Sequence, residues 1–179
     1  QNIEYTVEKN FGSRKAPISS VIQHIFALLK FRIFSQKEDD WIAIFNHYNI
    51  WMWHFLLLFT AARPVAEFPG FLKSFNLKRQ ILMVADKEVG GRQGYGRLIP
   101  LGHFVVQELQ KFIDFLDYFK TQIGPSQPEI SDHIQQILES KLPLLNIFQD
   151  GQWQPLRPSI IKKIHPELGL EHENWHRHT

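Results

Sequence analysis

The chain has no cysteine, and this absence removes several kinds of site at once. Among its 179 residues there is no Cys, and there are only two Met. A disulfide scaffold, a thiolate zinc centre and a cysteine nucleophile are therefore excluded. A chain without disulfides suits a reducing compartment, and we expect a cytoplasmic protein.

Long hydrophobic runs are missing as well. Residues 1–4, Gln-Asn-Ile-Glu, do not open a signal peptide, since no basic start is followed by an apolar run. The most apolar stretch covers residues 50–62, includes His54, and is shorter than the ~20 residues that span a bilayer. We therefore expect a buried core helix at this stretch and no membrane partner.

Neither sign of charge is in large excess. The chain has 20 Lys and Arg against 18 Asp and Glu, a net charge of +2 with a pI near 8.8. This balance permits a nucleic-acid partner without requiring one.

Hydrophobic residues make up 44 % of the chain and Phe alone numbers 15, which is ample for one packed core. We expect an arm or linker over residues 1–18 and one domain over residues 19–179.

Apolar periodicity and turn residues predict the order of the elements. Helices are expected over residues 19–36, 41–62, 65–71, 103–122, 129–141 and 159–164, with caps at Ser19 or Ser20, Asp39 or Asp40, and Ser159. Strands are expected at 81–85 and 97–101 around a glycine-rich turn at 90–96, and a second hairpin over 144–156 turning at Asp150-Gly151. Strands and helices do not alternate regularly, so the expected class is mainly α with a small antiparallel β-sheet (α+β).

The last eight residues, 172–179, contain a zinc-protease pattern. His172 and His176 stand four apart, which on a helix places both imidazoles toward one metal, and Glu173 would be the general base. Such a site needs a third protein ligand, usually downstream, and only three residues follow His176. A zinc-dependent hydrolase is therefore kept as an alternative.

Basic residues mark two other places in the chain. Arg63 directly follows the expected core helix, where its partner is either an anion or the helix-end carbonyls and Glu67. Five more cations surround the expected first hairpin: Lys73, Lys78, Arg79, Arg92 and Arg97. They indicate a basic face or an ordinary solvated surface.

Three segments, taken in order, resemble the catalytic domain of the tyrosine recombinase (phage integrase) family. Residues 60–64, Thr-Ala-Ala-Arg-Pro, are similar to the first arginine box, which reads Thr-Gly-x-Arg-Pro. Residues 84–87, the glycine-rich turn and residues 97–101, Arg-Leu-Ile-Pro-Leu, resemble the lysine hairpin. Residues 174–179, Asn-Trp-His-Arg-His-Thr, resemble the box usually read His-x-Leu-Arg-His-Thr. The resemblance covers roughly residues 20–179 and implies a tyrosine-recombinase-like catalytic fold.

The resemblance also implies a mechanism, in which a tyrosine attacks a DNA phosphodiester and forms a 3′-phosphotyrosyl link. Arg63 and Arg177 would each hold two phosphate oxygens, and Lys87 would protonate the departing 5′ oxygen. Asn174 would brace the phosphate. Residues expected to contact DNA are Arg92, Arg97 and His178, with packing as the other role open to His178. No metal or cofactor is required, and the partner is double-stranded DNA, on which the full-length parent would self-associate.

Three departures from the family pattern bear on activity. Asn174 replaces a usual His, so it can donate a hydrogen bond to phosphate but cannot shuttle a proton. Glu67 lies one position later than the usual acidic residue. The nucleophilic tyrosine of the family lies downstream of the second arginine, whereas all four tyrosines here precede Arg177. We therefore expect a DNA-binding catalytic-domain fragment of a site-specific integrase, inactive on its own; a zinc hydrolase and a non-catalytic DNA-binding module remain the alternatives.

Overall fold

The structure is a computed structural model that describes residues 19–37, 39–61, 68–85, 96–164 and 166. Its helices are α1 (Ser19–Phe34), α2 (Trp41–Thr60), α3 (His103–Ile123), α4 (Pro128–Leu138) and α5 (Pro158–Ile164), with a short 3-10 helix η1 (Leu72–Ser74). Its strands are β1 (Phe75–Asn76), β2 (Ile81–Ala85), β3 (Gly96–Pro100), β4 (Asn146–Gln149) and β5 (Gln152–Pro155). The expected class, helices with small antiparallel sheets, is confirmed.

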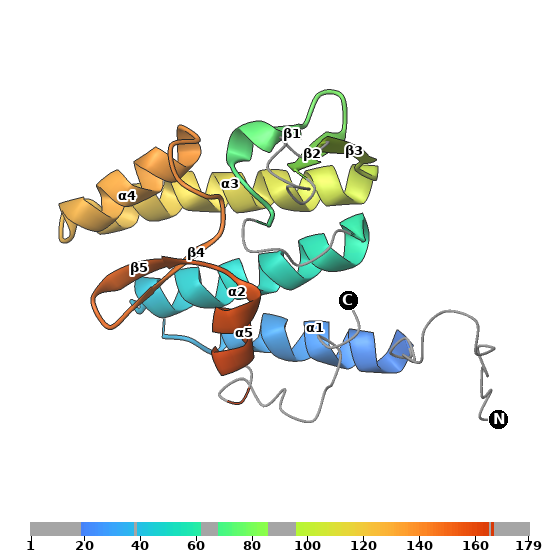
Figure 1. Cartoon of the computed structure of the whole chain (residues 1–179). Coiled ribbons are helices and arrows are strands. Elements are labelled where there is room, and N and C mark those ends of the chain that lie inside the picture. The colour runs from blue at the N-terminus through green and yellow to red at the C-terminus, as the bar shows by residue number, and fades with distance from the viewer. Residues whose placement is uncertain (1–18, 38, 62–67, 86–95, 165, 167–179) are drawn as a thin grey trace.

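Helix α2 is the central element of the fold. The Asp40 side chain caps its start by accepting a hydrogen bond from the amide of Ala43, at 3.1 Å. The helix is apolar on most sides and lies between α1 and the α3–α4 pair (Figure 1). Phe45 illustrates its packing, because it is fully buried and stacks on Phe119 of α3 with 5.0 Å between ring centroids. The prediction of a buried core helix is therefore correct.

Helices α3 and α4 form an antiparallel pair over α2 (Figure 1). Leu109, Phe112 and Leu116 are fully buried along one side of α3, as its amphipathic sequence predicts. The two helices are tied at their surface by Lys120, whose ammonium donates to Gln135 at 2.9 Å. Helix α4 starts at Pro128, a residue suited to a first helical turn because it has no amide hydrogen to satisfy.

The β4–β5 hairpin is held against α2 by asparagine side chains. Its turn residues Asp150 and Gly151 have φ of 53° and 73°, as expected for a tight hairpin turn. The Asn46 amide donates to the Phe148 carbonyl at 2.7 Å and accepts from the Phe148 amide at 2.8 Å. Asn49 accepts from the amide of Asn146 at 3.1 Å. These bonds satisfy one edge of β4, which would otherwise be unpaired.

The other sheet has three antiparallel strands in the order β1-β2-β3. Residues Leu82 and Val84 of β2 are buried in the core. Strand β1, which pairs Phe75 with Leu82, was not expected from the sequence because a two-residue strand has no periodicity to detect. Strand β3 leads through Gly102 directly into α3.

Several boundaries differ from the sequence-based expectations. Residues 68–71 of the expected helix over 65–71 are not helical: Phe68 and Pro69 form a turn, and Gly70 has a φ of 85°; the rest of that helix lies outside the described residues. Ser159 is not a cap, because α5 already begins at Pro158. Helices α1, α2 and α4 end two or three residues earlier than expected. Within the described ranges, no helix has both the length and the apolar character needed to cross a membrane.

Candidate functional site

Most of the residues predicted to form the site fall outside the described ranges. These are Arg63, Lys87, Arg92, Asn174, Arg177 and His178, together with Glu67 and the zinc-pattern residues His172, Glu173 and His176. Their predicted roles stay predictions. The described part of the chain contains the end of α2 that precedes Arg63, both strands of the hairpin that carries Lys87, and Arg97.

The end of α2 has a backbone conformation that favours glycine. Thr60 ends the helix, and its hydroxyl donates to the Leu56 carbonyl at 2.6 Å. Ala61 follows as the C-cap, with φ 47° and ψ 28°, in the left-handed region. A residue with a Cβ is uncommon there, and helices usually place Gly at such an end. The first arginine box has its glycine at this position.

The segment that should carry Lys87 is a regular antiparallel ribbon. Strands β2 and β3 pair along their whole length, from Ile81 opposite Pro100 to Ala85 opposite Gly96. The connection between them, residues 86–95, includes Lys87 and Arg92 and lies outside the described residues. At the base of the ribbon, the amide of Leu101 donates to the carbonyl of Gln80 at 2.7 Å. The expected pair of strands around a connecting turn is thus present.

Aromatic side chains bring the end of α2 next to the start of α3. Phe104, in the first turn of α3, contacts Phe55 and Phe59 of α2, both with centroid distances of 5.7 Å. Since β3 runs into α3 through Gly102, these contacts place the C-terminus of α2 beside the base of the ribbon (Figure 1). The end of α2 and the base of the ribbon therefore lie close together, although they are separated in the sequence.

Arg97 lies on the inner face of the ribbon. It stands opposite Val84, and cross-strand partners in an antiparallel pair point to the same side. Val84 is buried, whereas Arg97 is exposed, so the core ends between these two side chains.

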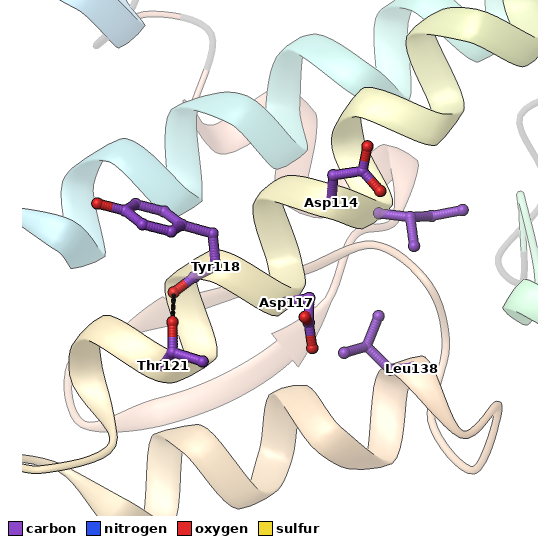
Figure 2. Close-up of a pocket in the computed structure, with 6 residues that line it drawn as sticks. Asp114, Asp117, Tyr118, Thr121 and Leu138 are labelled. Carbon is purple, nitrogen blue, oxygen red and sulfur yellow. Dashed lines mark hydrogen bonds between the residues drawn. The ribbon is translucent and has the colours of Figure 1, made fainter.

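A concave surface lies between α3 and α4 (Figure 2). It is a groove of about 480 Å³ lined by Ile113, Asp114, Asp117, Tyr118, Thr121 and Leu138. Asp117 pairs with Lys120 at 2.8 Å, Asp114 accepts from Gln110 at 2.9 Å, and Thr121 donates to the Tyr118 carbonyl at 2.6 Å. Two carboxylates on its rim make the groove unsuitable for a polyanion.

Metal binding is not indicated in the part of the chain that the structure describes. No three of its His, Asp and Glu side chains come together as metal ligands.

The chain matches no family model, no curated protein and no solved structure. A function is therefore inferred from the residues of this chain alone.

Sequence reasoning missed two features of the candidate site. The left-handed Ala61 could have been suspected from the pattern itself, since Ala stands there where the family has Gly. The exposed face of the ribbon could not be assigned, because residues 81–85, Ile-Leu-Met-Val-Ala, are apolar on both faces and show no alternation.

Proposed function

We propose that this chain binds double-stranded DNA as the catalytic-domain portion of a tyrosine-recombinase-like integrase. In this proposal Arg63 and Arg177 bind the phosphate at which the strand is cut, and Lys87 serves as the general acid. All four tyrosines of the sequence precede Arg177, so none matches the position of the family's nucleophile. The chain would thus contribute phosphate binding and transition-state stabilisation.

One observation carries most of the weight of the proposal. Ala61 has a left-handed backbone at the position where the first arginine box has glycine. A left-handed backbone costs an alanine roughly 1 kcal/mol relative to glycine. A Gly at this position adopts the same backbone conformation without strain.

The β2–β3 ribbon gives further support. The resemblance calls for two antiparallel strands joined by a loop with a lysine, ending in Pro-Leu before an amphipathic helix. Strands β2 and β3, Pro100-Leu101 and α3 follow one another in that order. The contacts of Phe104 with α2 place this ribbon near the helix end that leads to Arg63.

The proposal is tested by the binding of a fluorescent DNA duplex to the whole chain over a range of salt concentrations. We expect Arg63→Ala and Arg177→Ala each to weaken binding about 5- to 10-fold, because a bidentate charge-assisted contact is lost. Arg63→Lys should weaken it as well, since a lysine cannot bind two oxygens in the same fork. Arg157→Ala, at an exposed arginine before α5, is the matched control and should leave affinity nearly unchanged.

Three results would contradict the proposal. One is the absence of salt-dependent DNA binding by the unaltered chain. The other is stoichiometric zinc that is lost in His176→Ala, which would favour the hydrolase. DNA binding that is indifferent to both arginine changes would instead indicate a DNA-binding module without this chemistry.

A further inference from the structure

The outer side of α1 carries two aromatic side chains that the fold leaves exposed. Phe31 and Phe34 have exposed fractions of 63 % and 75 %, and the second value is the highest among the large hydrophobic side chains of the described residues. They lie three residues apart, so they are neighbours on one face of the helix. The face that packs on the core is marked by the buried Ile25 and Leu29. Two adjacent exposed rings at the end of one helix indicate a contact surface.

The charges next to this aromatic pair are all positive. Residues 19–37, which include α1, contain Lys30, Arg32 and Lys37 and no Asp or Glu. Lys30 is exposed and stands four residues before Phe34, which makes the two side chains neighbours on the helix surface. Two copies that met through the same face of α1 would bring like charges together, at a cost in affinity. The aromatic pair therefore suits a different surface, one that is concave, partly apolar and negatively charged.

The groove between α3 and α4 has these properties (Figure 2). Ile113 and Leu138 give it an apolar lining, and Tyr118 adds a ring that is 53 % exposed. Asp114 supplies an exposed carboxylate whose hydrogen bond, at 2.9 Å, comes from the neutral amide of Gln110. The groove volume of about 480 Å³ lies within the range of pockets that hold small organic groups, roughly 300–1,000 Å³. It can thus accept aromatic rings accompanied by a cation.

We infer that the end of α1 in one copy of this chain docks in the α3–α4 groove of another copy. Phe31 and Phe34 lie against the apolar lining, and Lys30 pairs with Asp114. The two sides of this contact differ, so it is heterologous and joins copies head to tail. In one molecule α1 and the α3–α4 pair lie on opposite sides of α2, so both surfaces are open to different neighbours (Figure 1). The contact needs no DNA and uses no residue of the proposed phosphate site, so it does not depend on the proposed function.

The size of the aromatic pair sets the expected strength of the contact. At roughly 200 Å² per ring, the two side chains expose about 300 Å² of apolar surface. A stable interface buries about 800 Å² on each partner, so we expect weak association with a Kd on the order of 0.1 mM. A heterologous contact that does not close into a ring produces chains of copies, with no fixed final number.

Sedimentation velocity of the whole chain without DNA tests the inference. Between about 10 μM and 0.5 mM, which bracket the expected Kd, the mean sedimentation coefficient of the unaltered chain should rise steadily. The α1 variant, Phe31→Ser with Phe34→Ser, and the groove variant, Asp114→Lys, should each raise the Kd at least ~10-fold and remain monomeric. Phe34→Ser alone replaces the double change if circular dichroism shows that the double variant does not fold.

A mixture of the two variants distinguishes a head-to-tail contact from a symmetric one. The α1 variant keeps an intact groove, and the groove variant keeps an intact α1, so one contact can still form between them. The mixture should therefore give a dimer and nothing longer, with about the affinity of the unaltered chain. Lys30→Glu combined with Asp114→Lys in one chain should restore association, because the ion pair forms again with its charges exchanged.

Asp132→Lys is the matched control for the groove variant. Asp132 is an exposed acidic residue of α4 that does not line the groove, and its replacement changes the net charge by the same amount. The Kd for association should stay within about 2-fold of that of the unaltered chain, because exposed charges outside the contact are screened by salt.

Three outcomes would overturn the inference: an unaltered chain that is monomeric at every concentration, a mixture of the two variants that stays monomeric, or an Asp132→Lys control that loses association as fully as Asp114→Lys. The failure of the proposed function would look different. A chain that does not bind DNA would overturn the proposed function and leave this inference standing, since the contact between copies is measured without DNA.

Discussion

At the scale of single residues, Ala61 is one of the described positions where a residue with a Cβ has a left-handed backbone. Its φ of 47° lies in a region that glycine occupies freely and alanine does not. The neighbouring Thr60 is buried, and its hydroxyl donates to the carbonyl of Leu56 in the preceding turn. The resulting strain is local and can be measured.

We expect Ala61→Gly to stabilise the protein by about 1 kcal/mol, because the left-handed conformation no longer opposes a Cβ. The change should appear as a higher urea midpoint with an unaltered slope. Ala27→Gly is the matched control: Ala27 is an exposed residue within α1, and the same substitution there should destabilise by about 1 kcal/mol. A destabilised Ala61→Gly variant would show that this helix end is not strained.

At the scale of elements, an unusual ring pair joins α4 to the β4–β5 hairpin. His133 of α4 stacks flat on Trp153 of β5, with 3.8 Å between centroids and 6° between ring planes. Trp153 in turn contacts Phe45 of α2 edge-on at 5.5 Å. The Nε2 atom of His133 is buried and has no hydrogen-bond partner among the described residues, so adding a proton there would place a charge at an unsatisfied site.

Burial lowers the pKa of His133 from 6.5 to about 4. The unfolded chain therefore binds this proton more readily than the folded protein, and stability must fall as the pH drops from about 6.5 to about 4. Because the ring is only half-buried, we expect a loss of ~1–2 kcal/mol rather than the full value of the shift. Urea unfolding at pH 7 and pH 4.5 measures it, and His133→Phe, which retains a stacking ring, should remove that part of the pH dependence. An unchanged pH dependence in His133→Phe would assign the effect to other groups.

The elements themselves show what the sequence could predict. Long periodic helices such as α2 and α3 were expected within a few residues, because apolar spacing and the Asp40 cap act locally. The Asp150-Gly151 hairpin was also expected from its turn residues. The bonds from Asn46 to Phe148 were not, since they join residues 102 positions apart and no local pattern reports such a contact. For the candidate site, motif order predicted the ribbon, but its apolar residues gave no sign of which face is exposed.

At the scale of the whole molecule, the described charges are separated by region. Residues 103–141, which include α3 and α4, contain six Asp or Glu and three Lys. The other described residues contain ten Lys or Arg and only three Asp. The acidic helical pair also carries the groove of Figure 2. A net charge of +2 therefore conceals a basic part and an acidic part, and only the basic part suits DNA.

This separation predicts that DNA affinity depends on where a charge lies and not on the net charge alone. Helix α4 packs near Lys120, some 17 residues along α3 from His103, or about 26 Å at 1.5 Å per residue. That distance exceeds the screening length of about 8–10 Å at physiological salt, so a charge on α4 has little effect at the β2–β3 ribbon. Lys78→Glu should weaken duplex binding at least 10-fold. Asp132→Lys changes the charge by the same amount in the opposite direction at an exposed residue of α4, and it should alter the affinity less than about 3-fold. The titration is done at 150 mM salt, about physiological ionic strength. If the two variants change affinity equally and in opposite directions, binding follows the net charge. The β2–β3 ribbon would then not be the DNA-facing surface.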